Sequence, residues 1–168
     1  PSPPAFIDVP LAPADIGGSN MIDTAETLAG EARIAREDAD AFALRSHERT
    51  LAAGDDGAFA DEIEPVNVPR PRGASETVEA DHGPRSDTSL DKLAALPPVR
   101  GRDAQVTAGN ASGVSDGAAM TVVMNEPAVE ASGARPLARI RASACVGVDP
   151  TRMGLGPVAA VRTLCDEQ

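Results

Sequence analysis

Two glycine-rich loops carry the residue types best suited to holding a ligand. The first spans residues 106–119 and reads VTAGNASGVSDGAA, with glycines at 109, 113 and 117. Glycine allows another backbone to approach closely, and the Asn, Ser and Asp side chains supply donors and acceptors beside exposed N–H groups. The loop can bind the polar part of a ligand or can be a turn that leads into a strand, and composition leaves both open. It is not a dinucleotide or P-loop motif, because neither GxGxxG nor GxxxxGK[ST] occurs.

The second loop spans residues 145–161 and reads CVGVDPTRMGLGPVAAV. Its Gly-Pro pair stands where a helix can start, since proline suits the first helical turn. Met153 lies between an arginine and a glycine, and a flexible apolar methionine can line a ligand channel. A plain link from strand to helix is the alternative.

The sequence shows no catalytic set of its own. Cys145 and Cys165 lack a neighbouring base and oxyanion donors, so we expect buried structural thiols. Two separated cysteines are also too few for a disulfide framework or a four-ligand zinc site, and we expect no metal. His47 and His82 are expected to be solvated surface histidines.

Composition excludes several classes of protein. The 168 residues include 26 acidic and 15 basic side chains, a net charge of −11, with three Phe and neither Trp nor Tyr. Nucleic acid is a poor partner for such a chain, because phosphate neutralisation and aromatic stacking dominate its binding. No apolar run approaches the roughly 20 residues of a membrane span, and no signal pattern is present. We therefore expect a cytoplasmic protein with no membrane partner.

The first 106 residues read as helices and surface loops. Residues 1–20 contain five prolines and predict an irregular connection, followed by a helix over 21–35 that Thr24 caps and Gly30 interrupts. A longer helix is predicted over 36–54, stopped by Gly54, with a packing face of small residues and one aromatic: Ala39, Phe42, Ala43, Ser46 and Thr50. Short strands are expected at 63–68 and 77–78, and a helix at 89–96 that ends at Pro97-Pro98.

The character of the chain changes near residue 106. Residues 1–106 hold 20 acidic and 10 basic side chains, whereas residues 107–168 hold 6 and 5. The later part predicts strands at 118–124 and 137–144, which alternate with helices at 125–133 and 157–165. That alternation is typical of an α/β layered architecture.

Six segments, in order, resemble the thiolase family of acyl-CoA C-acyltransferases. In the two loops, TAGNASGVSDGAA and GVDPTRMGLGPVAAVR resemble the matching segments of the family, and MIDTAETLA at 21–29 resembles its M-G-x-T-A-E-x-x-A segment. The remaining matches are REDADAFALRSHER at 36–49, FADEIEPV at 59–66 and PRSDTSLDKLAAL at 84–96. Two departures stand out: the segment 6–20 is shorter than usual, and LPPVRGRD replaces the family's K-P-A-F.

The resemblance implies a thiolase-like layered α/β fold in which this chain is an internal fragment. Residues 1–106 would be the loop domain that covers coenzyme A. Residues 107–134 would end the N-terminal core domain, and residues 135–168 would begin the C-terminal core domain. The remainder of a thiolase chain, CoA thioesters and a second copy in a homodimer are the implied partners. The short segment 6–20 puts a tetramer in doubt.

The same match assigns CoA and substrate contacts to particular residues. Arg85 stands where the family has an arginine near the nucleotide end of coenzyme A, and a fixed cation suits a phosphate. Ser112 and Ala108 match positions that contact the pantetheine arm. Met21 and Met153 match methionines beside the acyl and pantetheine channel. Asn20 replaces a histidine of some members.

The implied activity is acyl exchange between a 3-ketoacyl-CoA and CoA through an acyl-cysteine, with CoA as substrate and no permanently bound cofactor. The family's catalytic motifs, a C-x-S cysteine, N-E-A-F, G-H-P and a C-x-G cysteine, are absent from these residues. We expect no catalytic residue here and no activity of the 168 residues alone. The alternative is a noncatalytic thiolase-like CoA-binding or interaction protein. Acyl chain length and physiological direction are not encoded in these patterns.

Overall fold

The computed structural model describes residues 12–166, apart from the side chain of Arg72. Its chain divides into two compact units. The first comprises the residues up to Leu28 together with those from Asp116 onward, and the second comprises Ala29–Ser115. The boundary predicted near residue 106, with its three-part division, stays a prediction.

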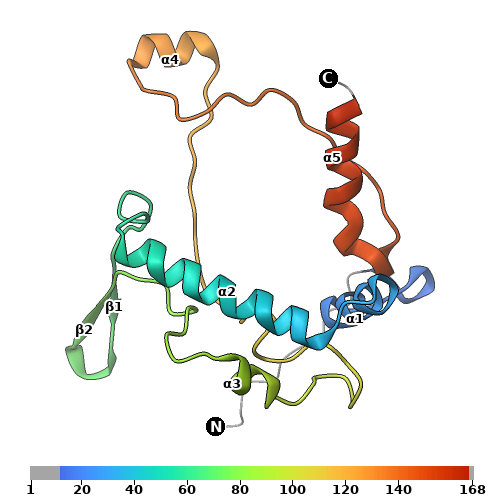
Figure 1. Ribbon diagram of the computed structural model, residues 1–168. Coiled ribbons are helices and arrows are strands. Elements are labelled where there is room, and N and C mark those ends of the chain that lie inside the picture. The colour runs from blue at the N-terminus through green and yellow to red at the C-terminus, as the bar shows by residue number, and fades with distance from the viewer. Residues whose placement is uncertain (1–11, 167–168) are drawn as a thin grey trace. The chain divides into compact units, whose positions relative to one another are not determined.

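The second unit is built around α2 (Arg36–Asp55), which packs against α3 (Leu90–Ala94), as Figure 1 shows. Both helices were predicted. The Ser89 side chain caps α3 by accepting the N–H of Lys92, and this satisfies one of the free donors of the first turn. Leu93 is the buried apolar residue of the pair, at 3% exposure.

The packing face of α2 agrees with the prediction only in part: Ala39, Ala43 and Thr50 are half-buried, but Phe42 and Ser46 are not. Phe42 is 65% exposed, with the Arg45 guanidinium 5.3 Å from its ring centre, whereas Asp40 is buried. The face turns toward Asp40 because an ion pair holds this carboxylate inside. Gly54 also does not end the helix; the chain leaves it near Gly57, which adopts a φ of 73°.

An antiparallel hairpin of β1 (Val66–Pro69) and β2 (Ser75–Val78) follows α2. The 3-10 turn η2 (Pro71–Gly73) joins the strands, and Val66 pairs with Val78. The sequence predicted both extended segments and the Pro-Gly turn between them.

The first unit contains η1 (Ala14–Ile16), α1 (Met21–Ala32, which continues into the second unit), α4 (Glu126–Ser132), η3 (Pro150–Leu155) and α5 (Gly156–Asp166). The three α-helices were predicted, although Gly30 does not interrupt α1. Of the irregular connection predicted over 1–20, residues 1–11 lie outside the described residues, and η1 is a single turn in the rest.

Asn20, not Thr24, caps α1. Asn20 Oδ1 accepts the N–H of Asp23 at 2.9 Å. Thr24 is buried one turn further along, and its hydroxyl donates to the Met21 carbonyl at 2.8 Å. Both residue types are common caps, so the choice between them depends on where the first helical turn begins.

The strands predicted at 118–124 and 137–144 are absent from the described part of the chain. These segments run as extended backbone without strand pairing in the described residues (Figure 1), and Met120, Val122, Leu137 and Ile140 are exposed. Apolar runs identify residues suited to a sheet, but a strand forms only when neighbouring strands pair with its N–H and C=O groups.

Candidate functional site

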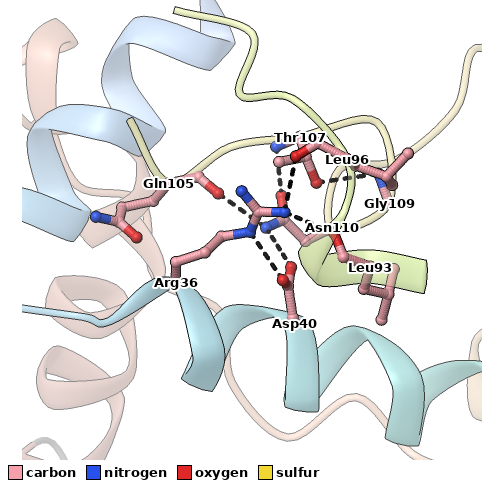
Figure 2. Close-up of polar contacts among 8 residues, drawn as sticks. All are labelled: Arg36, Asp40, Leu93, Leu96, Gln105, Thr107, Gly109 and Asn110. Carbon is pink, nitrogen blue, oxygen red and sulfur yellow. Dashed lines mark hydrogen bonds and ion pairs between the residues drawn. The ribbon is translucent and has the colours of Figure 1, made fainter. Parts of the chain in front are cut away.

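A buried ion pair ties together the elements of the candidate site (Figure 2). Arg36 and Asp40 lie one turn apart on α2, and Arg36 Nε donates to Asp40 Oδ2 at 2.8 Å. Asp40 is 3% exposed. The second guanidinium arm donates to the carbonyls of Leu93 and Leu96, at 2.7 and 3.2 Å. Arg36 therefore adds a side-chain donor to the Leu93 carbonyl, which also accepts the N–H of Leu96, and to the Leu96 carbonyl just beyond α3.

The TAGN turn at 107–110 is fixed by the Asn110 side chain. Its Oδ1 accepts the N–H of Thr107 at 2.8 Å, and its Nδ2 donates to the Gln105 carbonyl at 2.9 Å and to Asp40 Oδ1 at 3.0 Å (Figure 2). Thr107 is fully buried, and its hydroxyl accepts the N–H of Gly109. The side-chain oxygen and nitrogen of Asn110 thus hydrogen-bond within the protein, although the sequence presented Asn110 as a possible ligand contact.

A cavity of about 950 Å³ opens between α2, the segment 82–88, α3 and the loop 108–115. All of its lining residues belong to the second unit. Phe42, Leu93 and Leu96 give it apolar walls, and Arg85 and Lys92 give it two cations. A cavity with apolar walls and a few convergent polar groups is the usual form of a small-molecule site.

The cavity's charged residues are partly paired with one another. Lys92 Nζ lies 3.1 Å from Asp87 Oδ2 and donates to the Asp87 carbonyl. The hydrogen bond and positive charge of Lys92, with a further contribution from Arg85, hold the pKa of Asp87 below its ordinary value. Asp87 therefore stays ionised at neutral pH.

The two histidines also line this cavity; His82 is exposed, as expected, whereas His47 departs from the expectation of a solvated surface residue. His47 on α2 is half-buried, and its Nδ1 accepts the backbone N–H of Arg85 at 3.2 Å. His47 thereby connects α2 to the segment that carries Arg85. Its position on the helix gave no signal of this contact, because the partner is distant in sequence.

Three of the six predicted contact residues, Arg85, Ala108 and Ser112, lie together on the cavity lining. The other three belong to the first unit. There Met21 is 63% exposed, Met153 is half-buried in η3, and Asn20 caps α1. The residues that sequence reasoning missed are Arg36, Asp40 and Lys92; the i, i+4 spacing of Arg36 and Asp40 was the available signal.

Both cysteines are exposed free thiols, which corrects the expectation of burial. Cys145 follows the extended segment that packs against no strand, and Cys165 lies near the end of α5. Among the residues that the structure describes, no three His, Cys, Asp or Glu side chains gather in a way that could hold a metal ion. No helix in this part of the chain is long and apolar enough to cross a membrane.

The fold is that of a thiolase. The family model described as "Thiolase, N-terminal domain" matches residues 15–127. A crystal structure of the Bacillus anthracis acetyl-CoA acetyltransferase is similar with a TM-score of 0.84 and 42% identity, over 88% of this chain and 37% of that one. A crystal structure of human mitochondrial 3-ketoacyl-CoA thiolase is similar with a TM-score of 0.79 and 41% identity, over 91% of this chain and 38% of that one.

The chain belongs to the thiolase family. A β-ketoadipyl-CoA thiolase of Pseudomonas aeruginosa is 49% identical over 155 residues, which are 92% of this chain and 38% of that protein. An acetyl-CoA acetyltransferase of Allochromatium vinosum is 46% identical, over 89% of this chain and 38% of that protein. The chain thus spans less than two-fifths of the length of these relatives.

Proposed function

We propose that this chain is the coenzyme-gripping part of an acyl-CoA C-acyltransferase. In the intact protein, an acyl group would pass between a 3-ketoacyl-CoA and CoA through an acyl-cysteine on another segment of the polypeptide. The observation that supports this role is the shared cavity of Arg85, Ala108 and Ser112. Family resemblance had assigned these three residues to coenzyme contacts.

The chemistry of the cavity suits a CoA thioester. The Arg85 guanidinium offers a fork of N–H donors to a phosphate, whereas the charge of Lys92 is paired with Asp87 on the same lining. Leu93, Leu96 and Ala108 supply apolar contacts for a pantetheine arm, and the Ser112 hydroxyl can hydrogen-bond one of its amides. This chain would bind and orient the thioester and limit the access of water, while the acyl transfer itself occurs on the cysteine.

The proposal also covers the roles of Met21 and Met153 and the oligomeric state of the protein. Met21 and Met153 would border the acyl end of the substrate, and Asn20 would act through its α1 cap. We propose a homodimer, with a tetramer in doubt, in the cytoplasm. The free thiols of Cys145 and Cys165 suit a reducing compartment.

Calorimetric titration of the intact protein with CoA tests the role of Arg85. Arg85→Ala should weaken CoA binding about tenfold or more, because a charge-assisted hydrogen bond to phosphate contributes about 1.5–3 kcal/mol. Arg49→Ala is the matched control, since Arg49 is exposed on α2 and does not line the cavity. Equal affinities for the two variants would contradict the assignment.

Thiolysis of a 3-ketoacyl-CoA by the same intact protein tests the catalytic part. CoA-dependent cleavage is expected for the wild type, with a raised KM for CoA in Arg85→Ala. Tight CoA binding without any cleavage would instead identify a noncatalytic CoA-binding member.

A further inference from the structure

We propose that Arg36, Asp40 and Asn110 form a positioning cluster that sets the geometry of the cavity wall. The inference rests on the proposed function, because it assigns the cluster's effect to CoA binding. None of the three is proposed as a catalytic residue. Their role is to hold the end of α3 and the loop 107–112 in one fixed relation.

The first observation is the buried carboxylate of Asp40. It is 3% exposed, and each of its oxygens has one donor: Arg36 Nε on Oδ2 and Asn110 Nδ2 on Oδ1. A buried charge is tolerated only when it is paired and hydrogen-bonded, so this geometry is strongly restricted. Asp40 therefore fixes two donors at once, one on its own helix and one on the loop.

The second observation is the reach of Arg36. Its planar guanidinium contacts Asp40 with Nε and the Leu93 and Leu96 carbonyls with one terminal nitrogen. These carbonyls lie 57 and 60 residues away in sequence. A single side chain thus anchors the end of α3, whose Leu93 and Leu96 side chains form one wall of the cavity.

The third observation is that Asn110 hydrogen-bonds both to its own loop and to Asp40 on α2. The hydrogen bonds of its side-chain amide to the backbone of Thr107 and Gln105 hold the loop in its turn. Its hydrogen bond to Asp40 connects that loop to α2. Ala108 and Ser112 flank these anchored residues and line the cavity. Moving Asn110 would therefore move both proposed pantetheine contacts together.

Asn110 itself lines the cavity, but Arg36 and Asp40 do not, so positioning is separated from direct contact at these two residues. A residue that touches no ligand changes affinity only by displacing residues that do. Displacement of the loop should raise the KM for CoA, because small errors in the placement of binding groups are costly. Turnover at saturating CoA should change much less, since the reacting groups lie elsewhere.

The experiment compares Asp40→Asn with Asp38→Asn in the intact protein. The two substitutions remove the same charge from the same helix, but Asp38 is exposed. We expect Asp40→Asn to raise the KM for CoA in thiolysis about tenfold with kcat changed less than about threefold. Asp38→Asn should leave both unchanged. Melting temperatures of both variants establish that each is folded.

Arg36→Lys provides a second route should Asp40→Asn fail to fold. Lysine keeps the charge but lacks the fork that reaches both Asp40 and the α3 carbonyls, so the same rise in KM is expected. A folded variant of either kind with the KM of Asp38→Asn would overturn the positioning role. A folded variant in which kcat falls about tenfold while the KM for CoA stays unchanged would also overturn it, because the reacting groups rather than the CoA contacts would then be disturbed.

Titration of the wild-type protein with CoA alone separates the two hypotheses. Wild-type protein that binds no CoA overturns the proposed function. Wild-type protein that binds CoA, with Asp40→Asn binding equally well, overturns only the positioning inference.

Discussion

Gly109 shows how tightly single residues of the TAGN turn are packed. A Cβ atom built at this position would lie 2.5 Å from Leu93 Cδ2 and 2.6 Å from Leu96 Cδ1. Leu93 is almost completely buried, so its methyl group has little room to withdraw. Glycine is therefore required here by the close approach of α3, and no unusual backbone angle is involved.

Gly109→Ala should lower the free energy of unfolding of the intact protein by about 1–3 kcal/mol, the usual cost of overpacking a core. Gly113→Ala is the matched control in the same loop, because nothing lies within 4 Å of the Cβ position there. We expect that variant to stay within about 0.5 kcal/mol of the wild type. Urea unfolding measures both, and equal midpoints would show that the leucines move aside at no cost.

Residue types alone predicted which side chains could bind a ligand but not which were already engaged. Asn110 had the right chemistry for a ligand, yet its amide holds Asp40 and its own loop. His47 had no motif around it, yet it accepts the N–H of Arg85. Both outcomes depend on contacts between residues 38 to 70 positions apart, which local patterns do not encode.

At the scale of elements, local signals predicted every α-helix that the structure describes. Caps, proline positions and apolar spacing are properties of short segments, and Asn125 and Gly133 bound α4 as those rules require. The two strands predicted beyond residue 115 failed for the opposite reason, since a strand is completed by its neighbours. The prediction of strands β1 and β2 was confirmed because the two pairing strands are close in sequence.

The turn η3 offers a pH test at this scale. Asp149 Oδ1 accepts the hydroxyl of Thr151 at 2.7 Å and its backbone N–H at 2.8 Å, and these bonds, with the charge of Arg152, lower the pKa of Asp149. A lowered pKa means that the carboxylate's stabilising contribution is present above its ordinary pKa of 3.8. The contribution is lost as the pH falls through the lowered value.

Thr151→Val should raise the pKa of Asp149 part of the way to its ordinary value, because the backbone N–H remains. Carbon-detected NMR titration of the carboxyl group measures this shift. Asp116, an exposed carboxylate in the other glycine-rich loop, is the internal reference. An unchanged Asp149 titration in the variant would show that the hydroxyl does not hold the carboxylate in solution.

At the scale of the whole molecule, the resemblance of six segments predicted the thiolase family, whereas the sequence did not predict how the cavity residues pack together. The acidic residues concentrate before residue 107, where 20 acidic side chains outnumber 10 basic ones, and Arg85 and Lys92 are two of those cations. The structure places these two cations on one cavity. A count of charges could not predict that these two cations lie on the same cavity.

The exposed apolar side chains beyond residue 113 lead to the last prediction. Val114, Met120, Val122, Leu137 and Ile140 are each at least 75% exposed. Their extended backbone, within the described residues, pairs with no strand. Exposed apolar side chains of this kind promote association and bind apolar dyes. A polypeptide limited to residues 1–168 should therefore bind anilinonaphthalene sulfonate and unfold without a sharp transition.

The intact protein is the control for that measurement, since further strands can pair with these segments there. It should bind little dye and melt cooperatively. Calorimetry decides the matter: in the 168-residue polypeptide the van't Hoff enthalpy should differ from the calorimetric enthalpy. Agreement of the two enthalpies, together with a monomeric mass in solution, would show that these segments find partners within the 168 residues, and the extended conformation described above would then be wrong.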